Sequence, residues 1–247
     1  DYWISDAILT PDDTVERTVE TIYNLDRCCL NYTPPVEAPE VTLHQRTDTI
    51  TFGSFNDLSK VSDEAIELWS QVLMAVPSSR LLLKAKQFRD QSVQASLLKK
   101  FNDLGISSDR VTLHSRTPSR QEHLALYGKV DIALDTIPRT GGATTMEALW
   151  MGVPVITLAG ARFIERLSAS MIKELDHDDW IASNKDDYVA KAIALANDHD
   201  QRTHLRHSLR DAIKASPLCD GRDLAGSLET AYRDMWQRYL AGHASSS

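Results

Sequence analysis

The sequence predicts an α/β fold in which a parallel β-sheet is covered by helices on both faces. Two observations support this prediction. Short apolar runs alternate along the chain with longer stretches whose apolar residues recur at helical spacing. The runs also lack the polar alternation of half-exposed strands, which is typical of strands buried on both faces. Together these features imply β-α-β crossovers and a doubly wound, Rossmann-like sheet.

The predicted strands are rich in aliphatic and β-branched residues and end at turn-forming or polar positions. Gly53, for example, directly follows the first of them. In chain order, the predicted strands are residues 49–52, 81–83, 111–113, 131–135 and 155–158, with 179–182 as a final edge strand.

The predicted helices carry start and stop signals. Ser62 precedes two acidic residues and caps a helix in which Ile66, Trp69, Leu73 and Val76 recur at helical spacing. Glycines stop other helices, and a proline suits the first turn of one. The predicted helices are residues 62–76, a stretch ending at Gly105, 118–127 starting at Pro118, 144–151 closed by Gly152, 163–175, 188–196, 201–213 and 224–239.

A proline-rich segment divides the chain. Residues 33–40 contain three prolines, which neither continue a helix nor occupy a central strand. Residues 1–40, with an amphipathic stretch at 15–23, are therefore expected to form a separate first unit. The main lobe is expected over 41–215 and a last helical unit over 216–247, with a frayed tail from residue 243.

Composition narrows the possible functions. With 42% hydrophobic and 25% charged residues, the chain can build a globular core, and its net charge of −8 disfavours general nucleic-acid binding. No apolar run approaches the ~20 residues that span a bilayer. Cys28, Cys29 and Cys219 have neither a disulfide pattern nor zinc-ligand spacing, which favours a reducing, cytoplasmic location. The chain lacks an initiator Met and opens abruptly, so we expect a fragment of a longer protein.

The loop after the strand at 131–135 is the most informative segment. Gly141 and Gly142 allow the backbone to approach a ligand closely. The next three residues present free N–H groups and two threonine hydroxyls at a helix N-terminus, which suits a diphosphate. Glu147, just inside the helix, suits ribose hydroxyls. A glycine-containing loop before a threonine-capped helix is also common in α/β proteins without such a ligand.

Two further loops lead from predicted strands into helices. One delivers Lys60, a cation suited to neutralising a diphosphate leaving group; the alternative is a solvated lysine. The other places Arg120 and His123 on one helical face, where His123 suits a phosphate or nucleoside contact; the alternative is a surface or structural histidine.

Several motifs follow one another in a fixed order. They are Phe55-Asn56-x-Leu58-x-Lys60, Glu122-His123, Leu134-Asp135-Thr136 and Gly142-x-Thr144-Thr145-x-Glu147-Ala148-Leu149-Trp150-x-Gly152-x-Pro154-Val155. This combination resembles the C-terminal catalytic lobe of the O-linked N-acetylglucosamine transferase and SPINDLY family. Asp1-Tyr2 and Tyr32-Thr33-Pro34-Pro35 resemble the end of that family's N-terminal lobe and its crossover.

The resemblance implies a two-lobed GT-B architecture, each lobe Rossmann-like, with the nucleotide sugar held mainly by the C-terminal lobe. It implies inverting, metal-free transfer of N-acetylglucosamine from UDP-N-acetylglucosamine to Ser or Thr of protein acceptors, with no cofactor. The N-terminal lobe and a helical-repeat region are implied as further parts of the protein. Neither nucleic acid nor membrane is expected as a partner.

The resemblance also implies roles for individual residues. Lys60 would be catalytic and would stabilise the leaving nucleotide, Thr144 and Thr145 would hold phosphate, and Thr117 would lie where backbone groups meet the base. Asp57 departs from the glutamine of the animal enzymes, and Ala143 replaces a position that is often polar. The predicted donor-binding residues are Asn56, Asp57, Thr117, Arg120, His123, Gly141, Gly142, Ala143, Thr144, Thr145 and Glu147.

Other interpretations remain open at this stage. A close variant uses GDP-fucose, as SPINDLY does. Asp57 and Ala143 also fit a non-catalytic binding module. A sugar-nucleotide epimerase would need an acid/base set that we do not find. The two Asp-His-Asp segments, 176–178 and 198–200, suggest a metal site, against which stands their place in predicted solvated turns.

Overall fold

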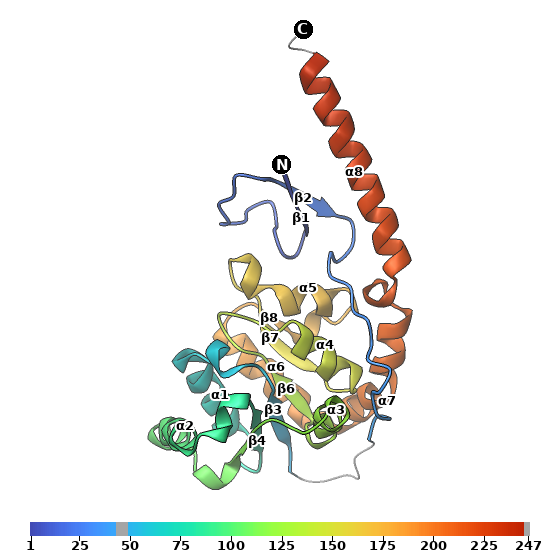
Figure 1. Cartoon of the computed structure of the whole chain (residues 1–247). Helices are drawn as coiled ribbons and strands as arrows, with labels where there is room; N and C mark the ends of the chain where they lie inside the picture. The colour runs from blue at the N-terminus through green and yellow to red at the C-terminus, as the bar shows by residue number, and fades with distance from the viewer. Residues whose placement is uncertain (43–48, 245–247) are drawn as a thin grey trace.

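The predicted α/β fold is confirmed. The computed structural model describes residues 1–42 and 49–244 and contains a six-stranded sheet and a separate two-stranded sheet (Figure 1). The order of the larger sheet is β5-β4-β3-β6-β7-β8, and every neighbouring pair is parallel. Its strands are β3 (Thr51–Ser54), β4 (Arg80–Lys84), β5 (Val111–His114), β6 (Ile132–Leu134), β7 (Val155–Leu158) and β8 (Ile181–Ala182).

The strand order reverses between β3 and β6. From β3 the chain builds outward through β4 to β5, and it then returns to β6 and builds outward on the other side through β7 to β8. The loops that leave the carboxyl ends of β3 and β6 therefore lead to opposite sides of the sheet from this point. In open α/β sheets this switch point is where ligands bind.

The helices connecting these strands lie close to their predicted positions. Ser62 caps α1 by accepting the N–H of Ala65 at 3.0 Å, and Trp69 of that helix is completely buried. The helices are α1 (Asp63–Ala75), α2 (Gln91–Asp103), α3 (Arg120–Ala125), α4 (Ala143–Trp150), α5 (Leu167–Lys173), α6 (Lys185–Asn197), α7 (His199–Ala215) and α8 (Gly221–Ala244).

Two predicted helix boundaries are wrong. The predicted helix at 163–175 is interrupted at Arg166, whose guanidinium donates to the carbonyls of Gly160 and Ile8, so a 3₁₀ turn at Phe163–Glu165 precedes α5. The predicted helix at 118–127 begins at Arg120 because Ser119 is its cap and accepts the N–H of Glu122. Pro118 precedes the cap and lies outside the first turn.

The N-terminal part forms its own small sheet from β1 (Tyr2–Asp6) and β2 (Thr21–Leu25), which pair in parallel. The amphipathic stretch at 15–23 thus runs into β2. Arg27 connects this part to the C-terminal region: its guanidinium lies 2.8 Å from the carboxylate of Asp223 and donates to the carbonyl of Asp220. Figure 1 shows α8 passing this small sheet and continuing beyond it.

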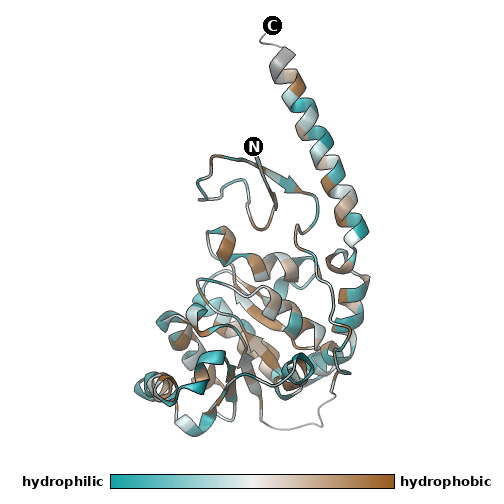
Figure 2. Ribbon diagram, viewed as in Figure 1, coloured by the Kyte–Doolittle hydropathy of each residue, from teal (hydrophilic) through white to brown (hydrophobic). Residues whose placement is uncertain are grey.

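Helix α8 exposes the large apolar residues Tyr232, Trp236, Tyr239 and Leu240. In Figure 2 hydrophobic residues occur among hydrophilic ones along its length. The helix runs to Ala244, so the frayed tail expected from residue 243 begins inside it, and residues 245–247 lie outside the described part. Within residues 1–42 and 49–244, no helix is both long and apolar enough to cross a bilayer.

Candidate functional site

The candidate site lies at the switch point of the sheet, where the loops after β3 and β6 approach the start of α4. Asn56 bridges them. Its side-chain oxygen accepts the hydroxyl of Thr144 at 2.8 Å, and its amide donates to the carboxylate of Asp135 at 3.4 Å. Asp135 directly follows β6 and Asn56 lies two residues after β3, so the sheet places both of them.

Lys60 lies between the same two loops. It ends a 3₁₀ turn after β3, and its half-buried ammonium donates to the carbonyl of Thr140 at 2.8 Å. Burial lowers the pKa of Lys60, and the negative charge of Asp135 opposes this. The positive charge of Lys60 is therefore balanced only in part by Asp135.

The carboxylate of Asp57 is occupied by other partners. It accepts the N–H of Ser59 at 3.0 Å and the amide of Gln87 at 2.8 Å, and it lies 3.4 Å from the ammonium of Lys86. These hydrogen bonds hold the pKa of Asp57 below its usual range. Its charge is therefore balanced on the Lys86 side of the turn, which reduces its repulsion of an anion near Lys60.

The first turn of α4 carries N–H groups that have no partner within the helix. Gly142 precedes it, Ala143 is exposed at its start, and the hydroxyl of Thr144 is held by Asn56. The hydroxyl of Thr145 is buried and lies 2.8 Å from that of Ser168. Any contact of Thr145 with a ligand would thus come through its backbone.

Gly141 is required by close packing before α4. A Cβ at this position would lie 2.1 Å from Oγ1 of Thr145 and 3.2 Å from Oδ1 of Asp135. The Gly141 N–H donates to the same Asp135 oxygen at 2.8 Å. A side chain here must therefore displace a buried, hydrogen-bonded threonine.

This crowding gives a testable prediction. Gly141→Ala should shift the start of α4 and weaken binding of a nucleoside diphosphate about tenfold, the usual size of an overpacking effect. Gly226→Ala on α8, where an added Cβ meets no atom within 4 Å, is the control. Calorimetry of both variants measures the difference, and equal affinities would show that α4 does not contact the ligand.

The second part of the site joins α3 to α4. Nε2 of His123 lies 2.9 Å from the Glu147 carboxylate, and Arg120 approaches the same carboxylate at 3.9 Å. The His123 ring also packs against Phe55 and Tyr127, with ring centroids 5.8 Å apart in each case. These contacts fix the His123–Glu147 pair against two buried aromatic rings, and such a pair suits the hydroxyls of a ribose.

Comparison with known proteins identifies the lineage. The profile of glycosyl transferase family 41 matches residues 40–228. The chain belongs to this family. It is 39% identical over 248 residues to a protein of Arabidopsis thaliana described as a probable UDP-N-acetylglucosamine–peptide N-acetylglucosaminyltransferase SPINDLY, covering 100% of this chain and 27% of that protein. A Caenorhabditis elegans UDP-N-acetylglucosamine–peptide N-acetylglucosaminyltransferase is 27% identical over 195 residues, 79% of this chain and 17% of its own.

Solved structures agree with this membership. A mutant O-GlcNAc transferase of Thermobaculum terrenum superposes with a TM-score of 0.87 at 32% identity, covering 96% of this chain and 45% of that one. The structure of TarM, at 18% identity and a TM-score of 0.59, shares the fold. The present chain thus spans about a quarter of the SPINDLY relative's length and under half of the bacterial transferase.

In this family-41 chain, the predicted residues fall into two contact groups. Asn56, Lys60, Gly141 and Thr144 surround the start of α4, and Arg120, His123 and Glu147 join α3 to α4. The hydroxyl of Thr117, in the loop between β5 and α3, donates to the carbonyl of Ser119 at 3.2 Å and is engaged locally.

Sequence reasoning did not place several residues in the site. Asp135 and Thr140 contact Asn56 and Lys60, and Tyr127 donates its hydroxyl to the carbonyl of Thr144 at 3.2 Å. The available signal was the position of Asp135 directly after a buried strand. That signal alone does not say whether the side chain faces a ligand or the interior.

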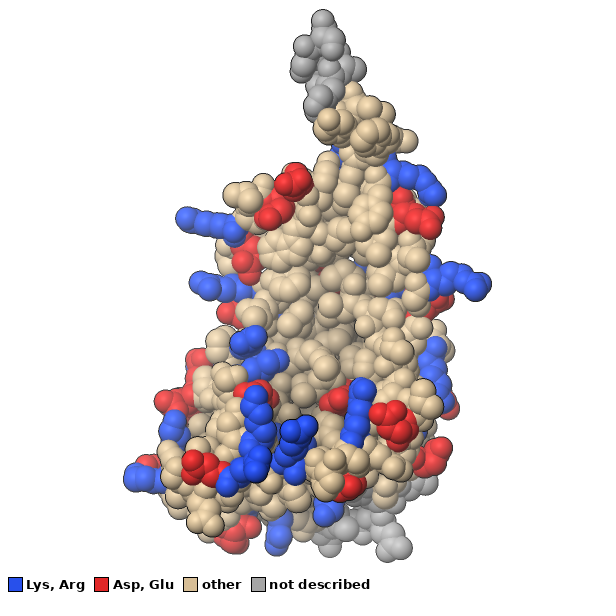
Figure 3. All heavy atoms as spheres, in the orientation of Figure 1, with Lys and Arg blue, Asp and Glu red and all other residues tan. Residues whose placement is uncertain are grey.

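One cavity lies beneath the switch point and is lined by Asn56, Asp135 and Thr144. It has a volume of only about 10 Å³, room for about one water, and is too small for a nucleotide. On the face seen in Figure 3, Lys and Arg side chains gather over the lower half, which the larger sheet and its helices form.

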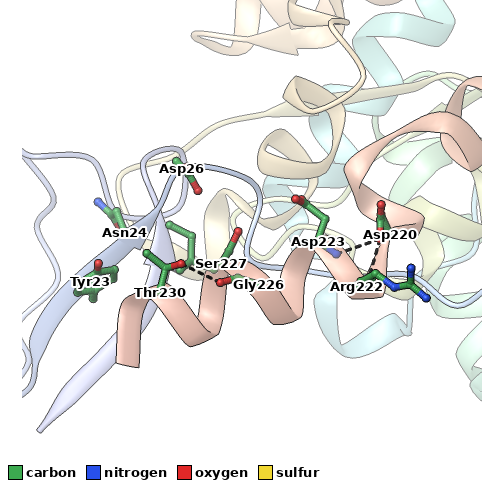
Figure 4. A pocket seen from close by; sticks show the side chains of 10 residues that line it. Tyr23, Asn24, Asp26, Asp220, Arg222, Asp223, Gly226, Ser227 and Thr230 are labelled. Carbon is green, nitrogen blue, oxygen red and sulfur yellow. Dashed lines mark hydrogen bonds between the residues drawn. The ribbon is translucent and has the colours of Figure 1, made fainter. Parts of the chain in front are cut away.

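A larger pocket lies away from this edge, between β2 and the start of α8. Its volume is about 760 Å³, and Figure 4 shows Asp26, Asp220 and Asp223 around it, with Arg222. Three carboxylates against one guanidinium make it unfavourable for a diphosphate.

The Asp-His-Asp segments have local roles. The side chain of Asp198 caps α7 by accepting the N–H of Gln201 at 2.8 Å. The ring of His177 stacks on Trp180 with centroids 3.7 Å apart, and burial lowers its pKa. Among the described residues, no three His, Cys, Asp or Glu side chains are grouped to hold a metal ion.

Proposed function

We propose that this chain is the donor-binding lobe of an inverting transferase that moves N-acetylglucosamine from UDP-N-acetylglucosamine to Ser or Thr hydroxyls of proteins. One observation carries the proposal: the Lys60 ammonium donates to the carbonyl of Thr140, in the loop that leads into the first turn of α4 at the switch point. A lysine and a helix N-terminus together are suited to a diphosphate. Family membership and the activities for which the relatives are named support the same donor.

The residues divide the work of this reaction. Lys60 and the N–H groups of α4 would face the two phosphates and stabilise the negative charge that develops as the glycosidic bond breaks. Asn56 keeps the Thr144 hydroxyl in place. His123 and Glu147 would hold the nucleoside. The acceptor hydroxyl attacks the anomeric carbon from the face opposite UDP as the bond to the diphosphate oxygen breaks, which inverts the configuration. UDP leaves with that oxygen, the hydroxyl proton is released, and no metal is needed.

We assign binding of the protein acceptor to the rest of the full-length protein. The relatives are much longer than this chain, and their additional length is large enough for an N-terminal lobe and helical repeats. We assign the β1–β2 sheet to the end of that N-terminal lobe and α8 to a helix that packs back toward it. The apolar residues exposed on α8 fit this assignment.

The full-length protein tests the proposed reaction. Incubated with labelled UDP-N-acetylglucosamine and a protein extract, it should transfer label to Ser or Thr in β linkage, as inversion of an α-linked donor requires. Transfer from GDP-fucose instead would change the donor to the SPINDLY-like alternative. Transfer from neither donor would favour a non-catalytic binding module.

Binding should also depend on pH through Lys60. Because burial places the pKa of Lys60 below its ordinary 10.5, the ammonium loses its proton at lower pH than an exposed lysine. Affinity for UDP is therefore expected to fall as the pH rises into the alkaline range. Calorimetry at a series of pH values measures this fall. In Lys60→Arg, whose guanidinium stays charged over this pH range, the fall in UDP affinity should begin at higher pH. If the affinity of the variant and of the unchanged protein falls equally, another group causes the pH dependence.

A further inference from the structure

A buried carboxylate lies directly behind the proposed diphosphate site. Asp135 follows β6 and is only 2% exposed. Its Oδ1 accepts the N–H groups of Gly141 at 2.8 Å and Thr136 at 2.9 Å and the amide of Asn56 at 3.4 Å. Its Oδ2 accepts the hydroxyl of Thr157 at 2.8 Å.

These partners suit the ionised form of Asp135. Three N–H groups face Oδ1 and a hydroxyl faces Oδ2, and an ionised carboxylate only accepts hydrogen bonds. Burial is the largest influence on the pKa of Asp135 and raises it overall, while hydrogen bonds from the hydroxyls of Ser168 and Thr157 and from N–H groups oppose this rise. The protein thus supplies donors in place of the water that burial removes.

The first consequence of this arrangement is geometric. Through Asn56, the Asp135 carboxylate is linked to the hydroxyl of Thr144 in the first turn of α4. Through Gly141, it holds the backbone just before that turn. One side chain therefore sets the loop after β3, the loop after β6 and the start of α4 relative to one another.

The second consequence is electrostatic. Burial is the main influence that lowers the pKa of Lys60, and the charge of Asp135 is the largest influence that raises it. The charge of Arg139 lowers it further, and that of Asp57 raises it. Tyr188 faces Asp135 from α6, where its hydroxyl donates to the backbone carbonyl at 3.1 Å. The two side chains also meet through one peptide group: the carbonyl of Thr140 accepts from Lys60, and the next N–H, that of Gly141, donates to Asp135.

We propose that Asp135 is a positioning residue for the donor diphosphate: its carboxylate holds Asn56 in place and, through the peptide group between Thr140 and Gly141, fixes the carbonyl to which Lys60 donates. The inference rests on the proposed function, because the diphosphate is that function's ligand. The coupling between Asp135 and Lys60 exists without any ligand and is tested separately.

The ligand-free test follows the titration of the Lys60 side chain by NMR in the 247-residue chain. The near-isosteric Asp135→Asn removes the charge that raises the Lys60 pKa and should therefore lower that pKa measurably. Thr157→Val removes one hydrogen bond to the carboxylate but keeps its charge, so Lys60 should titrate as in the unchanged chain. An unchanged Lys60 titration in folded Asp135→Asn overturns the electrostatic role.

If Asp135→Asn does not fold, the interaction between Asp135 and Lys60 can be measured instead through the pKa of Asp135. Linkage is reciprocal, so Lys60→Met should raise the pKa of the Asp135 carboxyl by a similar amount, measured by carbon NMR. Lys60 is half-buried at the edge of the lobe, and its loss leaves the core intact. An Asp135 titration that does not respond to Lys60→Met overturns the proposal equally.

The ligand test measures UDP affinity of the same variants. Asp135→Asn should bind UDP about tenfold more weakly at neutral pH, with a steeper alkaline decline, and Thr157→Val should lose less. If the unchanged chain binds UDP and Asp135→Asn binds it equally well, this inference fails while the proposed function stands. If the unchanged chain binds no nucleotide, the proposed function fails and the diphosphate role of Asp135 fails with it.

Discussion

Lys60→Ala in the full-length protein is expected to lower kcat for sugar transfer by about 10²–10³-fold, the usual result of removing one group that stabilises developing charge. The ammonium donates to the carbonyl of Thr140 beside the start of α4, where the leaving diphosphate would lie in the proposed reaction. Since negative charge on the leaving group increases during bond breaking, kcat should fall more than KM rises.

The control for this variant is Lys99→Ala. Lys99 is an exposed lysine of α2 that pairs with Asp103 four residues later, and its loss should leave kcat within error. Initial rates over a range of UDP-N-acetylglucosamine concentrations separate the two parameters. A Lys60→Ala enzyme with normal kcat would show that the leaving group is stabilised elsewhere.

Trp69→Ala should destabilise the lobe by about 3–5 kcal/mol, the range for truncating a large buried aromatic residue. Trp69 is 0% exposed between α1 and the sheet, and its indole N–H donates to the backbone carbonyl of Asp135 at 3.3 Å. The substitution thus opens a cavity and leaves a buried carbonyl with one donor fewer. Loss of fixed structure at Asp135 should also weaken UDP binding in the protein that remains folded.

Met74 on the same helix provides the matched comparison. It is 52% exposed, and Met74→Ala should change the free energy of unfolding by no more than about 0.5 kcal/mol. Urea denaturation of the two variants gives the difference directly. A Trp69→Ala chain as stable as Met74→Ala would mean that α1 does not pack on the sheet as described.

The larger sheet could be predicted from the sequence because its strands are continuous apolar runs. The interrupted helix after β7 could not, because the break depends on the guanidinium of Arg166 reaching the carbonyls of Gly160 and Ile8. The second carbonyl belongs to the N-terminal part, far away in the sequence. Local periodicity contains no information about such a contact.

The location of the candidate residues could also be predicted from the sequence, but the contacts between them could not. Loops after parallel strands converge at one edge, so Lys60, Gly141 and Thr144 could be placed there from their positions alone. The connections between them were not predictable. Asn56 could be named as a binding residue, but its role as a bridge from Asp135 to Thr144 depends on side-chain directions that only the folded chain fixes.

The most direct test of the donor-binding function is calorimetric titration of UDP, GDP and ADP into this chain without metal, beside Lys60→Ala. We expect UDP to bind in preference to GDP and ADP and Lys60→Ala to lose most of that affinity. Preference for GDP would replace the donor with GDP-fucose. Binding of none of the three, or UDP binding that Lys60→Ala leaves unchanged, would contradict a diphosphate site at the switch point of this lobe.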